Sequence, residues 1–182
     1  MMEERINVLS AGERFSYKGY DFICLDPDCE GGVLAIMAEA WTGKEMKFDA
    51  GNCNNYAVSS LRKKLLNDLL PELGEKNLLP HVVDLTADNG DDRYGTVTDK
   101  VFILSCDEYR KYRKHVPLLP EWMWTCTPWY INDAGNGSNV RFIHTAGNLY
   151  YYYAYGSFGV APACIFNPDN LKLRRQAHMV EV

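Results

Sequence analysis

The chain has 182 residues, of which 47% are hydrophobic, and this is enough for one compact domain with a sizeable core. Its net charge is −5 with acidic and basic residues mixed along the chain, so composition gives no reason to expect nucleic acid or an anionic membrane as partner. No stretch approaches the roughly 20 apolar residues of a membrane span, and the N-terminus lacks the apolar core of a secretory signal.

Two short strands joined by a tight turn are expected at residues 13–25, where apolar and polar side chains alternate around Lys18-Gly19. Residues 33–41 are predicted to form a buried strand, with a helix as the alternative because their period-two alternation is poor. The clearest helix is 59–70. Ser59 or Ser60 is expected to cap it, leucines recur at spacings of three and four, and Pro71 is expected to end it.

A second helix is expected from Ser105 to about His115. Ser105 and Glu108 have the spacing of a capping box, in which each side chain bonds the other residue's amide. The basic residues come late in this segment, as the helix dipole prefers. Residues 101–104 are predicted to form a short strand just before it.

The C-terminal part is expected to be a sheet. Its strands are predicted at residues 139–145 and 149–155, with a turn at 146–148, and an apolar strand at 160–166 closes it. Core aromatic side chains are expected before these strands, namely Trp122, Trp124 and Trp129.

These elements predict a single α+β domain over residues 1–182, with two helices and antiparallel sheets. Helices are expected toward the N-terminal half and strands toward the C-terminal half. The sequence contains no internal repeat and no linker that would divide it.

Residues 130–161 differ in composition from the rest of the chain. They hold six of its twelve tyrosines, and Tyr, Gly, Asn and Ser fill 17 of the 32 positions. Antibody loops use the same mixture, because tyrosine offers a large amphipathic contact at low rotamer cost and the small residues adapt to the ligand. We interpret this segment as a binding surface.

The tyrosine run strengthens this interpretation. In a strand, alternate side chains face opposite sides, so Tyr150 and Tyr152 share one face while Tyr151, Tyr153 and Tyr155 share the other. One set is able to pack inward, but burying both sets would require partners for five hydroxyl groups. At least two or three tyrosines should therefore be exposed, and exposed aromatic groups mark contact surfaces.

Five residue types are missing from residues 130–161: Lys, Glu, Gln, Met and Trp. Elsewhere they fill 32 of 150 positions, so roughly seven would be expected in a window of this length. These five are the amino acids that no codon ending in C encodes. Every residue in the window belongs to the other fifteen types.

Several short sequence motifs follow one another along the chain: GERFSYKGY at residues 12–20, SSLR at 59–62, TDKVFILS at 98–105 with DEY at 107–109, WT and TP at 124–128, and GVAPA at 159–163. In this order they resemble a bacterial and phage domain family with a C-type lectin-like, formylglycine-generating-enzyme-like fold. In that family the closing motif is usually G-V-R-P-A, and Ala161 replaces the arginine here.

Members of this group resemble the variable proteins of diversity-generating retroelements. In those systems, mutagenesis directed at the adenines of AAC codons diversifies the C-terminal part of a C-type lectin-like domain. The final C of the codon is kept, so the resemblance implies the same five missing residue types. It also implies a non-catalytic, receptor-type protein that binds a protein or carbohydrate ligand without a cofactor.

The resemblance divides the segment into an unchanging frame and displayed positions. The implied frame includes Trp124, Trp129, Gly147, Leu149, Gly159, Val160 and Pro162. The implied ligand-facing residues are Tyr130, Asn132, Asp133, Arg141, Phe142, His144, Asn148, Tyr150, Tyr152, Tyr153, Tyr155, Ser157 and Phe158.

Two alternatives stay open. The first is a structural or assembly domain of a phage or bacterial particle, in which the tyrosine strand forms a subunit contact. The second is an enzyme, either formylglycine-generating with Cys126 and Cys164, or a hydrolase that pairs a cysteine with a histidine. No flanking motif supports either enzyme. Without a signal sequence, the expected location is the cytoplasm or a phage particle.

No metal site is predicted. The pair Cys24 and Cys29 has no matching second pair, and reduced thiols are the preferred interpretation of all six cysteines. Residues 26–31 match the first half of a calcium-binding loop, but Met37 stands where a glutamate is needed. Residues 88–92 form an acidic turn that we interpret as a solvated loop.

Overall fold

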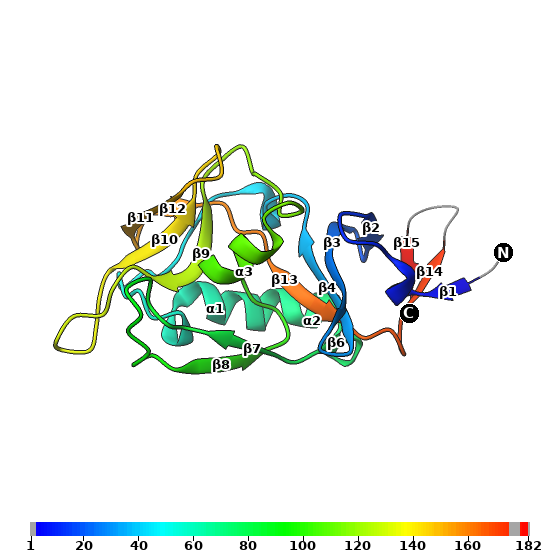
Figure 1. Ribbon diagram of the computed structural model, residues 1–182, viewed down its shortest axis with the longest axis horizontal. Helices are drawn as coiled ribbons and strands as arrows, with labels where there is room; N and C mark the ends of the chain where they lie inside the picture. The colour runs from blue at the N-terminus through cyan, green and yellow to red at the C-terminus, as the bar shows by residue number, and fades with distance from the viewer. Residues whose placement is uncertain (1–2, 175–178, 182) are drawn as a thin grey trace.

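The computed structural model describes residues 3–174 and 179–181, and its N-terminal part contains the predicted hairpin (Figure 1). β2 (Arg14–Tyr17) and β3 (Tyr20–Cys29) pair antiparallel across Lys18 and Gly19, whose φ angles are 49° and 83°. A two-residue hairpin turn of this type needs a positive φ at both central residues, which glycine adopts at little cost. The predicted hairpin is confirmed.

The hairpin belongs to an eight-stranded sheet that also joins the two ends of the chain (Figure 1). Its paired neighbours are antiparallel except β15 and β2, which run parallel. The sheet combines strands from both halves of the chain, so the expected segregation of helices and strands is wrong, because such long-range pairing leaves no local sequence pattern. In spatial order the strands are β1 (Glu3–Arg5), β14 (Lys172–Arg174), β15 (Met179–Glu181), β2, β3, β4 (Gly32–Met37), β13 (Ala163–Phe166) and β6 (Leu78–Leu79).

The strands predicted at residues 33–41 and 160–166 are the neighbours β4 and β13 of this sheet, but both are shorter than predicted. β4 ends at Met37, with a 3-10 turn beginning at Trp41, and β13 begins only at Ala163. Both are buried along their whole length. Phe166 lies in the core between these strands and packs edge-to-face with Phe15 and Phe22, with ring centroids 5.3 Å and 5.0 Å apart. The helical alternative for residues 33–41 is therefore wrong.

The first predicted helix forms, but it continues past Pro71. It consists of α1 (Ser60–Lys64), a π-helical turn η4 (Leu65–Leu69) and α2 (Leu70–Leu73). The hydroxyl of Ser59 caps it by accepting a hydrogen bond from Arg62 N at 3.1 Å. Proline lacks an amide, and the π turn before it already departs from the i→i−4 pattern, so little is lost at Pro71. The helix ends at Gly74, whose φ is 82°.

The second predicted helix is α3 (Cys106–Tyr112), and both hydrogen bonds of the capping box between Ser105 and Glu108 are present. It ends three residues before His115. The expected strand at 101–104 reduces to a single bridge between Phe102 and Ala163. A separate antiparallel hairpin precedes it, formed by β7 (His81–Asp84) and β8 (Thr96–Asp99).

The C-terminal strands form a second, three-stranded sheet in the order β11-β10-β9. Its members are β9 (Met123–Pro128), β10 (Asn139–Ile143) and β11 (Leu149–Tyr153). β10 and β11 start where predicted and each ends two residues early, whereas no range was predicted for β9. A two-stranded ladder lies beside them, formed by β12 (Ser157–Phe158) and β5 (Met46–Lys47). Short 3-10 turns complete the chain: η1 (Ile6–Val8), η2 (Trp41–Gly43), η3 (Tyr56–Val58) and η5 (Glu75–Asn77).

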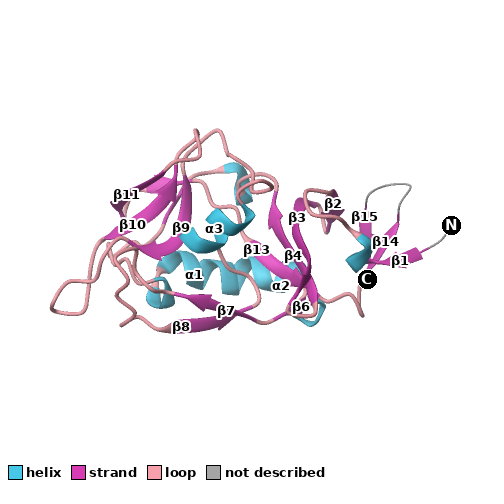
Figure 2. Cartoon of the chain, viewed as in Figure 1, coloured by secondary structure: helices cyan, strands magenta, loops and turns pink. Residues whose placement is uncertain are grey.

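Figure 2 shows the three-stranded sheet at one end of the long axis and the strands that join the chain termini at the other. α1 and α2 cross the middle between them. The molecule is a single α+β domain, as predicted. Among the described helices, none is both long and apolar enough to cross a membrane.

Candidate binding surface

All five tyrosines between residues 150 and 155 are exposed, with 43% to 50% of each side chain accessible to solvent. The expectation that at least two or three would be exposed is met, but neither set packs wholly inward. The reason is the position of β11, which is the outer strand of a three-stranded sheet. Both of its faces therefore reach solvent.

One face of this sheet carries a continuous aromatic cluster. Trp122 stacks on Phe142 with ring centroids 4.8 Å apart, and Tyr150 stacks on the same ring at 6.0 Å. Tyr152 leans on Phe158 at 5.6 Å. Phe142 and Phe158 are only 3% and 7% exposed, so their expected display to a ligand is wrong. They form the floor on which the exposed tyrosines rest.

Trp122 was expected to be a core residue, yet 37% of it is exposed. Trp124 is buried as expected, and its indole nitrogen donates to Met46 O at 2.9 Å. Both tryptophans contact Phe142 and Phe158, but Trp124 lies within the buried strand β9, whereas Trp122 precedes β9 and lies at the solvent-exposed side of this aromatic cluster.

The opposite face carries a smaller stack. Tyr151 lies on Trp129 with ring centroids 4.3 Å apart and an interplanar angle of 17°. The guanidinium of Arg141 lies 5.0 Å from the same Trp129 ring, and Arg141 Nε is 3.7 Å from a carboxylate oxygen of Asp88. Only 12% of the Arg141 side chain is exposed, so Arg141 is a supporting residue and not a displayed one. Tyr151 is exposed and was missing from the predicted set.

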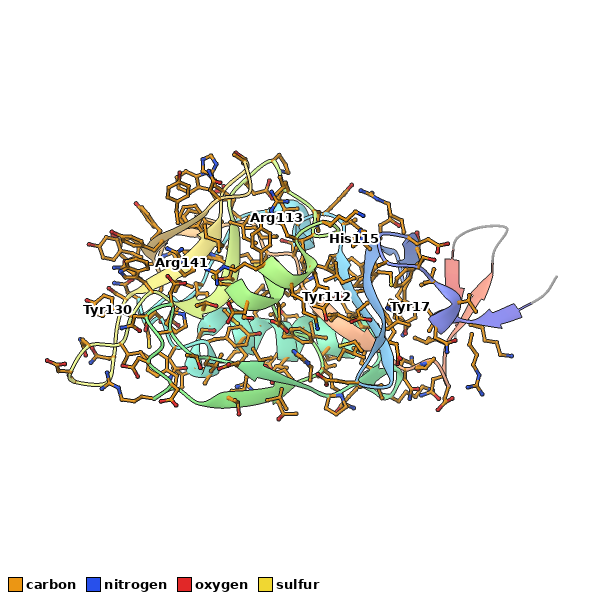
Figure 3. All side chains as sticks on the ribbon, in the orientation of Figure 1. Tyr17, Tyr112, Arg113, His115, Tyr130 and Arg141 are labelled. Carbon is orange, nitrogen blue, oxygen red and sulfur yellow. The ribbon has the colours of Figure 1, made fainter. Side chains whose placement is uncertain are left out.

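The other predicted positions fall near the rim of this surface. Tyr130 is exposed and lies with Arg141 at the β10 end of the molecule (Figure 3). Asn132 is half-buried, because its side chain bonds Asn136 within the loop. His144 is half-buried between Trp122 and Tyr150. The fully exposed remainder is Asp133, Asn148 and Ser157.

Asn54 holds the loop at residues 130–138 in place and was not found by sequence reasoning. Its side chain is wholly buried, and its amide nitrogen donates to Tyr130 O at 2.9 Å and to Asn139 O at 3.0 Å. Its amide oxygen accepts from the Tyr94 hydroxyl at 2.8 Å. Asn52, Asn54 and Asn55 lie close together in the sequence, and nothing in the sequence separates Asn54 from a turn residue.

Other residues outside the segment hold its main chain in the same way. Arg93 donates to Asn132 O at 2.9 Å, and the Tyr109 hydroxyl donates to Gly147 O at 2.7 Å. Asn52 accepts from Tyr155 N at 3.3 Å. These contacts use main-chain atoms of residues 130–161, so they do not depend on which side chains the segment carries.

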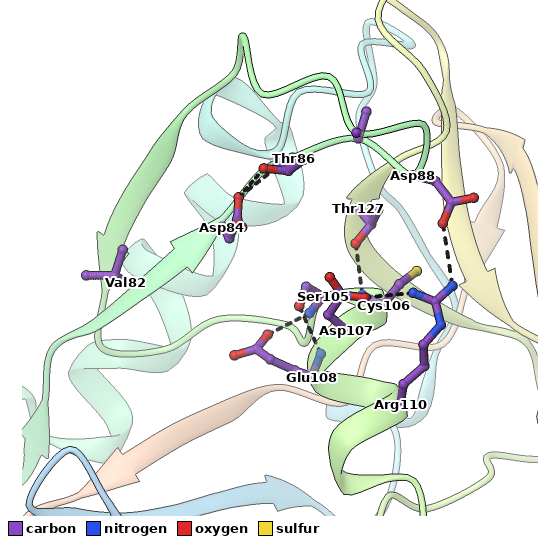
Figure 4. A pocket seen from close by; sticks show the side chains of 12 residues that line it. Val82, Asp84, Thr86, Asp88, Ser105, Cys106, Asp107, Glu108, Arg110 and Thr127 are labelled. Carbon is purple, nitrogen blue, oxygen red and sulfur yellow. Dashed lines mark hydrogen bonds and ion pairs between the residues drawn. The ribbon is translucent and has the colours of Figure 1, made fainter.

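The principal cavity of the described chain lies elsewhere, between the β7 end and α3, with a volume of about 390 Å³ (Figure 4). Most of its charged groups are in ion pairs, and the Asp84 carboxylate accepts hydrogen bonds from Thr86. Arg110 contacts Asp107 at 2.8 Å and Asp88 at 3.6 Å, while Glu108 is held by the capping box. The Cys106 amide donates to Thr127 Oγ1 at 2.9 Å.

The buried cysteines do not have the lowered pKa of a nucleophile. Burial raises the pKa of Cys106 and Cys126, and it raises the pKa of Cys24 to about 12. A reactive thiol needs a lowered pKa, from a nearby cation or histidine. The Sγ atoms of Cys106 and Cys126 contact Thr125 Oγ1 and Asp84 O instead. All six cysteines are free, although Cys29 and Cys53 are only partly buried.

His81 is engaged in a structural contact. Its two ring nitrogens lie 2.8 Å from Glu30 and 2.7 Å from Glu108, and its ring stacks on Phe102. Burial lowers the pKa of His81, but the two carboxylates outweigh this effect and the pKa is raised. The imidazole therefore links the β3–β4 turn to α3.

Within residues 3–174 and 179–181, no three or more His, Cys, Asp or Glu side chains are arranged so that they could hold a metal ion. The acidic turn at 88–92 is occupied by arginines, since Asp91 contacts Arg93 at 2.6 Å and Asp88 contacts Arg110 and Arg141. Asp26 lies within β3, where it accepts from the Tyr112 hydroxyl at 3.2 Å.

We compared the chain with protein-family models, curated proteins and solved structures. None of them matches it significantly.

Proposed function

We propose that this protein is a non-catalytic binding protein of the C-type lectin-like kind, whose surface at residues 130–161 is diversified by a retroelement. The observation that carries the proposal is the separation of roles described above. Residues outside the segment, among them the buried Asn54 and Tyr109, bond to its main chain, whereas its tyrosines are displayed. A surface built in this way tolerates new side chains without losing its shape.

The exposed positions add independent support. Fourteen residues of the segment are exposed, and none is Lys, Glu or Gln. These types are common at protein surfaces, so burial does not explain their absence there. The same five types are also missing from residues 162–171, but β13 is buried and excludes most of them anyway. Restriction to codons ending in C accounts for the exposed positions.

Glycines at two implied frame positions fit the same division. A Cβ atom at Gly147 would lie 2.1 Å from Arg113 Nη2, and the φ angle of 85° disfavours other residues. At Gly159 a Cβ atom would lie 2.8 Å from Glu121 Cγ. Phe142 and Phe158 join this frame, because they are buried beneath the tyrosines.

The ligand is a protein or a carbohydrate. Tyrosine rings stack on sugar rings and also bury well against protein epitopes, with hydroxyl groups left for polar contacts at the rim. The raised thiol pKa values and the paired charges in the cavity beside α3 favour binding without chemistry.

The gene tests the diversification. We expect the codons for the displayed tyrosines to end in C, and a near-copy of the segment with AAC codons to lie beside a reverse transcriptase gene. Tyrosine codons that end in a mixture of T and C, with no such repeat nearby, would leave a plain binding module of the same architecture.

Replacing Tyr150, Tyr152 and Tyr153 together with serine tests the role of the displayed side chains. The protein should stay folded, with a loss of about 1 kcal/mol of unfolding free energy per tyrosine, because each is already half exposed. Its mass in light scattering should not change. Substitution of the exposed Val58 and Val82 by serine is the control. If wild-type protein is oligomeric and only the tyrosine variant dissociates, the assembly alternative replaces our proposal.

A further inference from the structure

We infer that the outer edge of β11 binds an extended polypeptide segment of the partner as an additional strand. This inference rests on the proposed function and specifies the class of ligand. The hydrogen bonds around β10 show which main-chain groups of β11 are free. Ala154 N donates to Ser138 O and His144 N donates to Asn148 O at the two ends of the β10–β11 pair. The main-chain N–H and C=O groups of the even-numbered β10 residues are therefore directed toward β11. Asn139 O accepts from Trp129 N on the other side.

The alternation of an antiparallel pair then fixes the orientation of β11. Tyr150 and Tyr152 direct their main-chain groups toward β10, while Leu149, Tyr151 and Tyr153 direct theirs outward. The Tyr153 carbonyl accepts from Gly156 N at 2.8 Å. The main-chain N–H and C=O groups of Leu149 and Tyr151 have no hydrogen-bond partner anywhere in the part of the chain described.

These free groups repeat every second residue, about 6.8 Å apart, which is the repeat of an extended chain. Sheet edges are usually protected by charged side chains, proline or a bulge. β11 has the sequence LYYYY and carries none of these. A sugar lacks the regular donor–acceptor repeat that the edge offers, so we favour a polypeptide as the ligand.

The tyrosines would line both sides of the added strand. Tyr150 and Tyr152 flank its path on one face of the sheet, and Tyr151 and Tyr153 flank it on the other. Side chains of an added strand alternate between these faces. Main-chain pairing supplies affinity that does not depend on the side chains of β11, while the tyrosines supply specificity. Such a division suits a surface whose side chains change.

The test uses linear peptides selected from a random phage-displayed library for binding to the whole protein. In amide hydrogen exchange of the free protein, the amides of Leu149 and Tyr151 should exchange rapidly while those of Tyr150 and Tyr152 are protected. A selected peptide should protect Leu149 and Tyr151. In an added strand, every second main-chain N–H of the peptide faces β11. Methylation of these nitrogens should abolish binding, whereas methylation of the nitrogens that face away from β11 should not.

Two variants at one position separate the main chain from the side chain. Tyr151→Ser and Tyr151→Pro both remove the phenol, but only proline removes the outward N–H and blocks the edge. We expect the proline variant to bind selected peptides about tenfold more weakly than the serine variant. Continued protection of Tyr150 and Tyr152 shows that the proline variant remains folded.

The outcomes distinguish this inference from the proposed function. One outcome would be that the triple serine variant no longer binds the peptides, while Leu149 and Tyr151 of the wild-type protein stay unprotected when a peptide is bound. The proposed binding surface would then stand, and edge pairing would be wrong. Failure to select any linear peptide, or selective retention on immobilised glycans, also overturns it. Protection of Leu149 and Tyr151 in the wild-type protein alone, together with a dimeric mass, would make a second copy of the chain the occupant.

Discussion

Replacing Asn54 with alanine should destabilise the protein by about 3 kcal/mol, because the substitution leaves two partly buried carbonyls and a hydroxyl without their partner. The lost bonds join Asn54 to Tyr130, Asn139 and Tyr94, so the loop at 130–138 should loosen before the rest of the domain. Denaturant unfolding measures the stability, and limited proteolysis within 130–138 reports the loosening.

The neighbouring Asn55 is a matched control. Its side chain makes one local bond, accepting from Ala57 N at 2.9 Å at the start of η3. Asn55→Ala should therefore cost about 1 kcal/mol, as the loss of a helix cap does. Asn54→Asp keeps the acceptor for Tyr94 but loses both donors, and should be no more stable than Asn54→Ala. Equal, small losses at Asn54 and Asn55 would contradict the anchoring role of Asn54.

Replacing Asp99 with alanine should also lower the free energy of unfolding by about 3 kcal/mol or more, because it leaves a partly buried arginine without its charge partner. Arg62 bonds both carboxylate oxygens of Asp99, with Nε at 2.8 Å and Nη2 at 2.7 Å. Asp99 is only 4% exposed, and these hydrogen bonds raise the pKa of Arg62. The pair fastens α1 to β8, and urea unfolding of the variant measures its contribution.

The control for Asp99 lies one turn further along the same helix. Lys64 and Asp68 form an ion pair at 3.0 Å in which both side chains are about half exposed. Asp68→Asn should change the unfolding free energy by no more than about 0.5 kcal/mol, since solvent screens such pairs. Added salt should weaken the Lys64 pair more than the Arg62 pair. A loss at Asp99 no larger than that at Asp68 would show that burial adds nothing to the Arg62 pair.

The contact between Arg62 and Asp99 also connects two of the short sequence pieces noted at the outset. SSLR at 59–62 and the TD pair at 98–99 lie far apart in the chain, yet they meet in this ion pair. Neither piece indicates its partner, because an ion pair between distant residues leaves no periodic pattern in the sequence.

Local chemistry was readable from the sequence alone. The turn at Lys18 and Gly19, a serine cap at residue 59 or 60, the capping box at Ser105 and a strand that begins at Leu149 each follow from a few neighbouring residues, and each is present. The unusual composition of residues 130–161 was equally plain. For these features the physical cause lies within one turn or one strand.

Tertiary structure alone decided which of those side chains are displayed. Phe142 and Phe158 are buried beneath the tyrosines, and Arg141 supports Trp129 from below the surface. Tyr151 is exposed on the second face of β11, which is the outer strand of its sheet. Sheet order, the anchoring by Asn54 and the open main chain of β11 arise from contacts between residues distant in sequence. The alternation of side chains in a strand predicts which of them share a face. Only the packing of that face against the rest of the domain determines whether the face is covered or exposed.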